Sequence, residues 1–120
     1  MKKLLVVLCL VLFCGCGPLH ISGEYDVTGS GGCTSADITY ATPDGGTGQV
    51  TGVTLPWSYS FTATLDGSNN DSVFVNVIAQ NDQSSGTVTT SIKKNGSVAF
   101  GPNYGTGAYA IATSTGSFTP

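Results

Sequence analysis

The segment Trp57-Ser58-Tyr59-Ser60-Phe61-Thr62-Ala63-Thr64-Leu65 decides the fold class, because its apolar side chains alternate with Ser and Thr. This period of two residues is typical of a β-strand that buries one face and exposes the other to water. A polar stretch with a glycine, residues 66–71, follows and predicts a loop at the end of the strand.

Shorter runs with the same alternation recur through the chain. Pro43–Gly46 and Asp82–Gly86 predict turns, and Asn95-Gly96 predicts a type I′ hairpin, since both of its central positions need a positive φ. The pattern predicts seven or eight short antiparallel strands after an N-terminal signal segment. Such strands are typical of an all-β, immunoglobulin-like β-sandwich, which we expect over residues 24–120. A small Greek-key barrel is the alternative. The predicted strands are 24–28, 36–40, 49–55, 57–65, 73–79, 87–93, 97–100 and 108–115.

Two runs carry specific expectations about burial. The run 73–79 is apolar on both faces, which is typical of a central strand covered on each side. In the last run, Tyr109 and Ile111 are the larger apolar residues. A few large aromatic side chains suffice to anchor a core of this size, and those expected to contribute are Tyr40, Trp57, Tyr59, Phe61, Phe74, Phe100 and Tyr109.

The first sixteen residues form a separate unit. Lys2 and Lys3 precede an apolar run over 4–13, and Phe13-Cys14-Gly15-Cys16 follows. This layout is typical of a bacterial lipoprotein signal, so we predict a signal peptide over residues 1–15 and lipidation of Cys16, with residues 16–23 as the lipidated tether. Ordinary signal cleavage and an uncleaved anchor are the alternatives. As a helix the apolar run would rise about 15 Å, half of the ~30 Å hydrocarbon core.

The net charge and the few cysteines are consistent with a protein that works outside the cytoplasm. Without residues 1–15 the chain keeps two cations, Lys93 and Lys94, and all seven acids, for a formal charge of −5. Such a surface repels phosphate, so we expect neither a nucleic acid nor an anionic lipid headgroup as partner. The expected location is the cell membrane or outer membrane, facing the periplasm or the exterior. Cys33 is then a buried small residue, a free thiol or an intermolecular partner.

Candidates for chemistry are few. The single histidine, His20, lies in the predicted tether, so a nucleophile in the folded region has no histidine base and zinc has no ligand cluster; we predict neither an enzyme nor a cofactor. Asp66–Asp71 carries side-chain oxygens at alternate positions, but it has no glycine at the sixth place and no closing Glu, so a plain loop is favoured over a calcium loop. Trp57 is expected in the core, with sugar stacking as the alternative.

Several segments together resemble one known family, the extracytoplasmic domain of the MmpS proteins (mycobacterial membrane protein, small). The resemblance covers roughly residues 25–115. It rests on the following segments: Ile38-Thr39-Tyr40, Asp44-Gly45-Gly46, Val53-Thr54-Leu55-Pro56-Trp57-Ser58, Ala79-Gln80-Asn81, Ile92 before Asn95-Gly96, and Gly107-Ala108-Tyr109-Ala110-Ile111-Ala112.

The resemblance implies a β-sandwich that assists a resistance-nodulation-division (RND) exporter of lipids or siderophores. Members of the family are held by an N-terminal transmembrane helix, whereas this chain has a lipoprotein-like start. They often carry a cysteine pair that aligns with Thr90 and Ser114 here, so that disulfide is absent.

The expected function is therefore that of a lipid-anchored, non-catalytic accessory or interaction module of the cell envelope, for example for an RND-type (MmpL-like) exporter. The membrane, through the lipid, and a transporter or other envelope protein are the expected partners. A surface module for carbohydrate- or calcium-dependent adhesion and a small envelope inhibitor of a secreted hydrolase are the alternatives, because sandwich folds host many functions.

Overall fold

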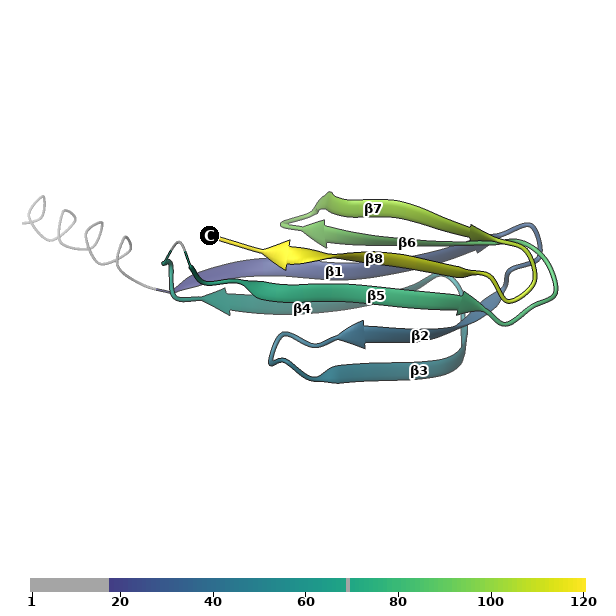
Figure 1. Ribbon diagram of the computed structural model, residues 1–120, viewed down its shortest axis with the longest axis horizontal. Coiled ribbons are helices and arrows are strands. Elements are labelled where there is room, and N and C mark those ends of the chain that lie inside the picture. The colour runs from purple at the N-terminus through teal and green to yellow at the C-terminus, as the bar shows by residue number, and fades with distance from the viewer. Residues whose placement is uncertain (1–17, 69) are drawn as a thin grey trace, which may run out of the picture.

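The computed structural model describes residues 18–68 and 70–120, and this part of the chain folds into two β-sheets packed face to face (Figure 1). One sheet has the order β4-β1-β6-β7 and the other β3-β2-β5-β8, all antiparallel. The prediction of an all-β sandwich is confirmed. The eight strands are β1 (Leu19–Ser30), β2 (Ser35–Ala41), β3 (Thr47–Thr54), β4 (Trp57–Leu65), β5 (Val73–Asn81), β6 (Thr87–Lys94), β7 (Ser97–Thr106) and β8 (Ile111–Phe118).

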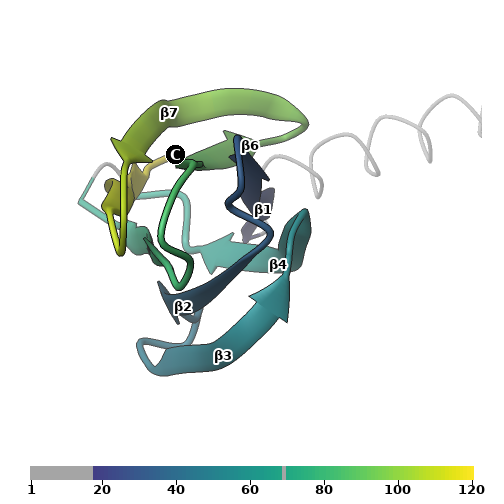
Figure 2. The ribbon, with the colours of Figure 1, turned by 90° about the vertical axis from the view of Figure 1, so that its right-hand side faces the viewer.

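The chain changes sheet at most of its connections. Only the β2–β3 and β6–β7 hairpins join neighbours within one sheet. In the β6–β7 hairpin, Asn95 and Gly96 have φ angles of 52° and 86°, which confirms the predicted type I′ signal. Viewed from its end, the sandwich shows β2 and β3 on one side and β6 and β7 on the other (Figure 2).

The two ends of the sandwich carry different parts of the chain. The N-terminal end holds the start of β1, the C-terminus and the β2–β3, β4–β5 and β6–β7 connections (Figure 1). The opposite end, called the distal end here, holds the four other connections, residues 31–34, 55–56, 82–86 and 107–110.

A chain of seven aromatic rings runs through the core. Tyr25 of β1 lies 4.8 Å from Phe61 and 6.1 Å from Tyr59, both on β4, between ring centroids. Tyr40 of β2 lies 4.6 Å from Tyr59, so the rings join the two sheets. Such tilted and offset pairs are favourable beyond the area that they bury. Trp57, Phe100 and Phe118 complete the chain.

Three glycines make room for these rings. A Cβ at Gly23 would overlap the ring of Phe61, its direct neighbour across β1 and β4. Gly48 lies in the same way under its cross-strand neighbour Tyr40, and Gly116 under Phe100 of the facing sheet. The strands thus contain glycine where an aromatic ring covers the backbone and replaces the missing side chain.

Tyr25 also provides a polar link between the sheets. Its side chain is fully buried, and its hydroxyl donates to the carbonyl of Ala41 at 2.6 Å and accepts from the N–H of Asn76 at 3.3 Å. Burial raises the pKa of Tyr25, so the hydroxyl stays protonated and keeps its donor role.

Three expectations from the sequence need correction, on the tether, on β5 and on the last strand. β1 begins at Leu19, so residues 19–23 belong to the sheet and not to the predicted tether. β5 is not covered on both faces, because Phe74 is 58% exposed. Tyr109 and Ile111 are 60% and 55% exposed; β8 instead turns Ala112, Ser114 and Phe118 inward.

Candidate functional site

The predicted lipidation site, Cys16, and the predicted signal peptide, residues 1–15, lie outside the described residues. The first strand begins three residues after Cys16, at Leu19. Within residues 18–68 and 70–120 there is no helix of the length and apolar character that a membrane span requires.

The predicted candidates for chemistry do not converge on one site. His20 lies on β1, where its Nδ1 is 3.2 Å from the Thr64 hydroxyl of β4. Among the described residues, no group of three or more His, Cys, Asp or Glu side chains is placed to hold a metal ion. In the loop 66–71 the carboxylates bind the loop itself: Asp71 accepts from the N–H of Asp66 at 2.6 Å, and Asp66 from the N–H of Ser68 at 2.8 Å.

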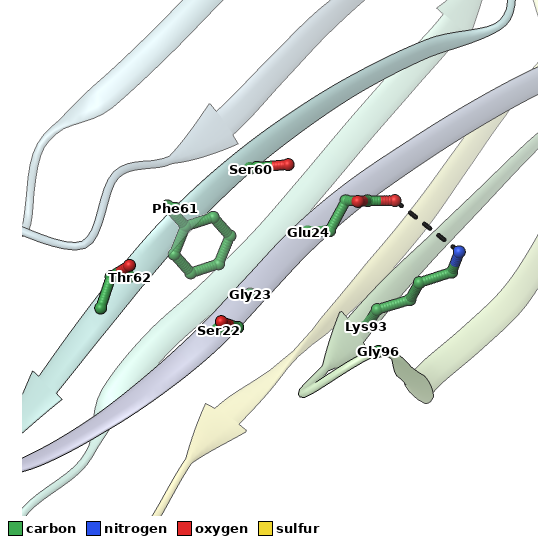
Figure 3. Close-up of a pocket in the computed structure, with 8 residues that line it drawn as sticks. All are labelled: Ser22, Gly23, Glu24, Ser60, Phe61, Thr62, Lys93 and Gly96. Carbon is green, nitrogen blue, oxygen red and sulfur yellow. Dashed lines mark ion pairs between the residues drawn. The ribbon is translucent and has the colours of Figure 1, made fainter.

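The outer face of the sheet β4-β1-β6-β7 carries a hollow of about 420 Å³ beside Lys93 (Figure 3). Small side chains of β1 and β4, such as Ser22 and Ser60, line it together with Phe61. A second hollow of about 420 Å³ lies on the same face, and Lys93 lines both. Hydroxyls, two carboxylates and one ammonium group therefore dominate this face.

Lys93 pairs with two acids of β1. Its Nζ lies 3.7 Å from Glu24 and 3.4 Å from Oδ2 of Asp26, and that oxygen is buried without a hydrogen bond. Burial, followed by the neighbouring Glu24, raises the pKa of Asp26, whereas hydrogen bonding to Asp26, followed by Lys93, lowers the pKa of Glu24. The pKa values of the two carboxyl groups are thus shifted in opposite directions, that of Asp26 upward and that of Glu24 downward.

Trp57 and Cys33 both pack in or against the core. Trp57 is partly buried and packs against Tyr40, with ring centroids 5.4 Å apart, so its expected core position is confirmed in part. Cys33 is a free, buried cysteine, which agrees with the reading as a small buried residue. Burial, and then the charge of Asp82, raise the pKa of its thiol, so the sulfur stays protonated and weakly reactive.

The distal end holds a network of hydrogen bonds that the sequence did not predict. Asn81, fully buried at the end of β5, donates through Nδ2 to the carbonyls of Ser85 (2.8 Å) and Gly107 (3.2 Å). Its Oδ1 accepts from the N–H of Gln83 at 2.9 Å, and its own N–H donates to the carbonyl of Ala110 at 2.9 Å. One side chain therefore fastens the β5–β6 and β7–β8 connections together.

A sequence signal for this network does exist. Val75, Val77, Ala79 and Asn81 share the inward face of β5, so an amide stands in an otherwise apolar row. A buried amide needs partners for its donors and its acceptor, and the nearest turn supplies backbone groups. The pattern would have pointed to Asn81 as an organiser of the distal loops.

Fold and surface place the chain among the small all-β sandwich domains, which make contacts through sheet faces, edges and end loops. A family model described as Mycobacterium membrane protein matches residues 16–101. The match spans more than half of the chain, and the chain therefore belongs to this MmpS-type family. A search of curated proteins finds no match.

Proposed function

We propose that this protein is a lipid-anchored, non-catalytic module of the cell envelope that assists an RND-type, MmpL-like exporter. The observation that carries the proposal is the family match, which starts at Cys16 and runs to Gly101 in β7. It supports both the membrane association and the accessory role that the sequence resemblance implies. Acylation of Cys16 supplies the anchor, and the sandwich faces the periplasm or the exterior.

The tether between the proposed anchor and the first strand is short. Only residues 17 and 18 separate Cys16 from the first strand, a step of at most about 10 Å. β1 has 12 residues and so extends about 40 Å. The anchor would therefore keep the N-terminal end of the sandwich close to the bilayer, and in an upright domain the distal end would stand about 40 Å further out.

The non-catalytic role rests on how the polar groups are used. Lys93 is held by two acids, and the loop carboxylates are held by backbone N–H groups. A nucleophile would need an accessible base, and His20 lies on the first strand, against Thr64. The described polar groups stabilise the sandwich and its surface.

Crosslinking in intact host cells tests the proposal. The full chain, tagged at its C-terminus, is crosslinked, purified under denaturing conditions and identified with its partners by mass spectrometry; cells with the untagged protein serve as control. We expect an RND-type exporter among the specific products. A secreted hydrolase in its place supports the inhibitor alternative. Retention on a glycan array, lost in Glu24→Gln at the hollow of Figure 3, supports the carbohydrate alternative.

A further inference from the structure

The distal end presents three large exposed side chains on the β7–β8 connection and the strand ends that flank it. Tyr104 near the end of β7, Tyr109 in the β7–β8 connection and Ile111 at the start of β8 are 65%, 60% and 55% exposed. The strand ends that carry them touch, since a Cβ at Gly105 would press against the backbone of Ile111. We propose that these three residues, called the distal patch, dock a basic surface on the extracytoplasmic part of the exporter; this inference rests on the proposed function.

The backbone of Tyr109 is held in a conformation that a tyrosine rarely adopts. Its φ is 57°, in the left-handed region that favours glycine. Both of its backbone groups are fixed, because its N–H donates to the carbonyl of Gln83 at 3.2 Å and its carbonyl accepts from Nε2 of Gln80 at 3.2 Å. A residue kept in a strained conformation, with an aromatic ring turned to solvent, points to a role for that ring.

Hydrogen bonds fasten the backbone beneath the patch. Asn81 ties both distal connections together through its side chain, and the N–H of Gly107 donates to the carbonyl of Gly86 at 2.8 Å. A preorganised aromatic surface loses little conformational entropy on binding, which is the property of residues that dominate interface energies.

The charge around the patch selects the chemistry of the partner. Asp82 is the one charged residue in the four distal connections, 31–34, 55–56, 82–86 and 107–110. Both lysines of the sandwich, Lys93 and Lys94, stand beside the β6–β7 hairpin at the N-terminal end. Oδ1 of Asp82 accepts from Ser35 and Gln83, so arginine or lysine of a partner would pair with its other carboxylate oxygen and lie over the tyrosine rings.

Substitution of Tyr109 by glycine separates binding from folding. Glycine accepts the same φ without strain, so Tyr109→Gly is expected to fold with an unchanged or higher urea midpoint. The matched control is Phe74→Ala, which removes an aromatic ring of similar exposure from the start of β5, at the N-terminal end. The full-length variants are expressed in host cells, crosslinked, and compared in the amount of exporter that copurifies.

We expect Tyr109→Gly to lower the recovered exporter about tenfold, the effect of losing a binding hot spot, and Phe74→Ala to leave it unchanged. Raising NaCl from low to high ionic strength should also weaken the solubilised complex. If Tyr109→Gly recovers as much exporter as the wild type does, the role of the distal patch is overturned and the proposed function still stands. If the wild-type chain itself recovers no exporter, the proposed function fails and the patch fails with it.

Discussion

Thr90 and Ser114 face each other across the interior of the sandwich with their hydroxyl oxygens 2.9 Å apart. Both are fully buried; Thr90 lies on β6 and Ser114 on β8, in opposite sheets. Ser114 donates to the carbonyl of Thr90 at 3.0 Å and accepts from Nδ2 of Asn103 at 2.9 Å, which leaves the Thr90 hydroxyl to donate to Ser114. These are the positions that the MmpS resemblance aligns with a cysteine pair, and in this protein hydrogen bonds join the two sheets there.

This contact predicts that a disulfide can be introduced between the two positions. In Thr90→Cys/Ser114→Cys, the two sulfurs would replace oxygens already in contact, and the new bond would close a loop over a sequence separation of 24. The oxidised double variant should gain about 3 kcal/mol in free energy of unfolding, measured by urea denaturation with and without reductant. The single cysteine variants serve as controls. Failure of the oxidised variant to form the bond, shown by peptide mass mapping, would contradict the placement of β6 against β8.

Loss of the Asn81 side chain should loosen the distal end. Asn81→Ala leaves two carbonyls and one N–H without their partner, and such buried unpaired groups cost about 2–4 kcal/mol in total. Urea denaturation measures the free energy of unfolding. Asn76→Ala, a less buried asparagine on the outer face of the same strand, should change it by less than about 0.5 kcal/mol. Equal effects of the two substitutions would show that the network does not hold the loops.

The fit of Gly23 under Phe61 predicts that the effects of mutations at these two positions on the free energy of unfolding are not additive. Gly23→Ala should destabilise the sandwich by about 2–3 kcal/mol, because its Cβ overlaps the ring. Phe61→Ala removes a buried ring and should cost about 3–5 kcal/mol. In the double variant the methyl group occupies the space of the ring, so the combined loss should be smaller than the sum. Strictly additive losses would rule out this contact.

Asp26 and Glu24 should shift stability with pH in opposite directions. The pKa of Asp26 is raised above 3.8, so the folded state holds its proton more tightly, and stability falls as pH rises from about 3.8 through the raised value. The pKa of Glu24 is lowered below 4.5, so its contribution is present above pH 4.5 and is lost as pH falls through the lowered value.

Two amide variants test these signs by urea midpoints at pH 4 and pH 7. Asp26→Asn should be at least as stable as the wild type at pH 7, and its advantage should shrink at pH 4. Glu24→Gln should be less stable than the wild type at pH 7, because it gives up the pairing with Lys93. An Asp26→Asn protein that loses stability relative to the wild type on going from pH 4 to pH 7 would refute the assignment.

The sequence predicted the fold best where alternation was strict. β4 was expected at 57–65 and is found at Trp57–Leu65, and the Asn95-Gly96 hairpin forms as expected. The expected strand 97–100 is shorter than β7, which continues to Thr106. Gly101 and Pro102 signal a strand end, yet β7 is an edge strand, where the missing N–H of proline costs no ladder bond.

Other errors arise from tertiary contacts that no local pattern reveals. Tyr109 belongs to the β7–β8 connection, so β8 starts later than expected and its inward face is the one with Ala112, Ser114 and Phe118; a shift of one residue exchanges the two faces of a strand. The Asn81 network and the distal patch both depend on which loops meet at the distal end. The pairing of the strands decides which loops meet, and the one sequence signal for it was the Asn81 amide in an apolar row.

Intact mass spectrometry of the full protein extracted from host membranes tests the central claim most directly, namely a sandwich held to the membrane through Cys16. We expect a chain that starts at Cys16 and carries an additional mass from acyl groups. We also expect the Cys16→Ser variant to lack this additional mass and to be lost from the membrane fraction. An unmodified chain that begins at Met1, with the mass of all 120 residues, would contradict this account.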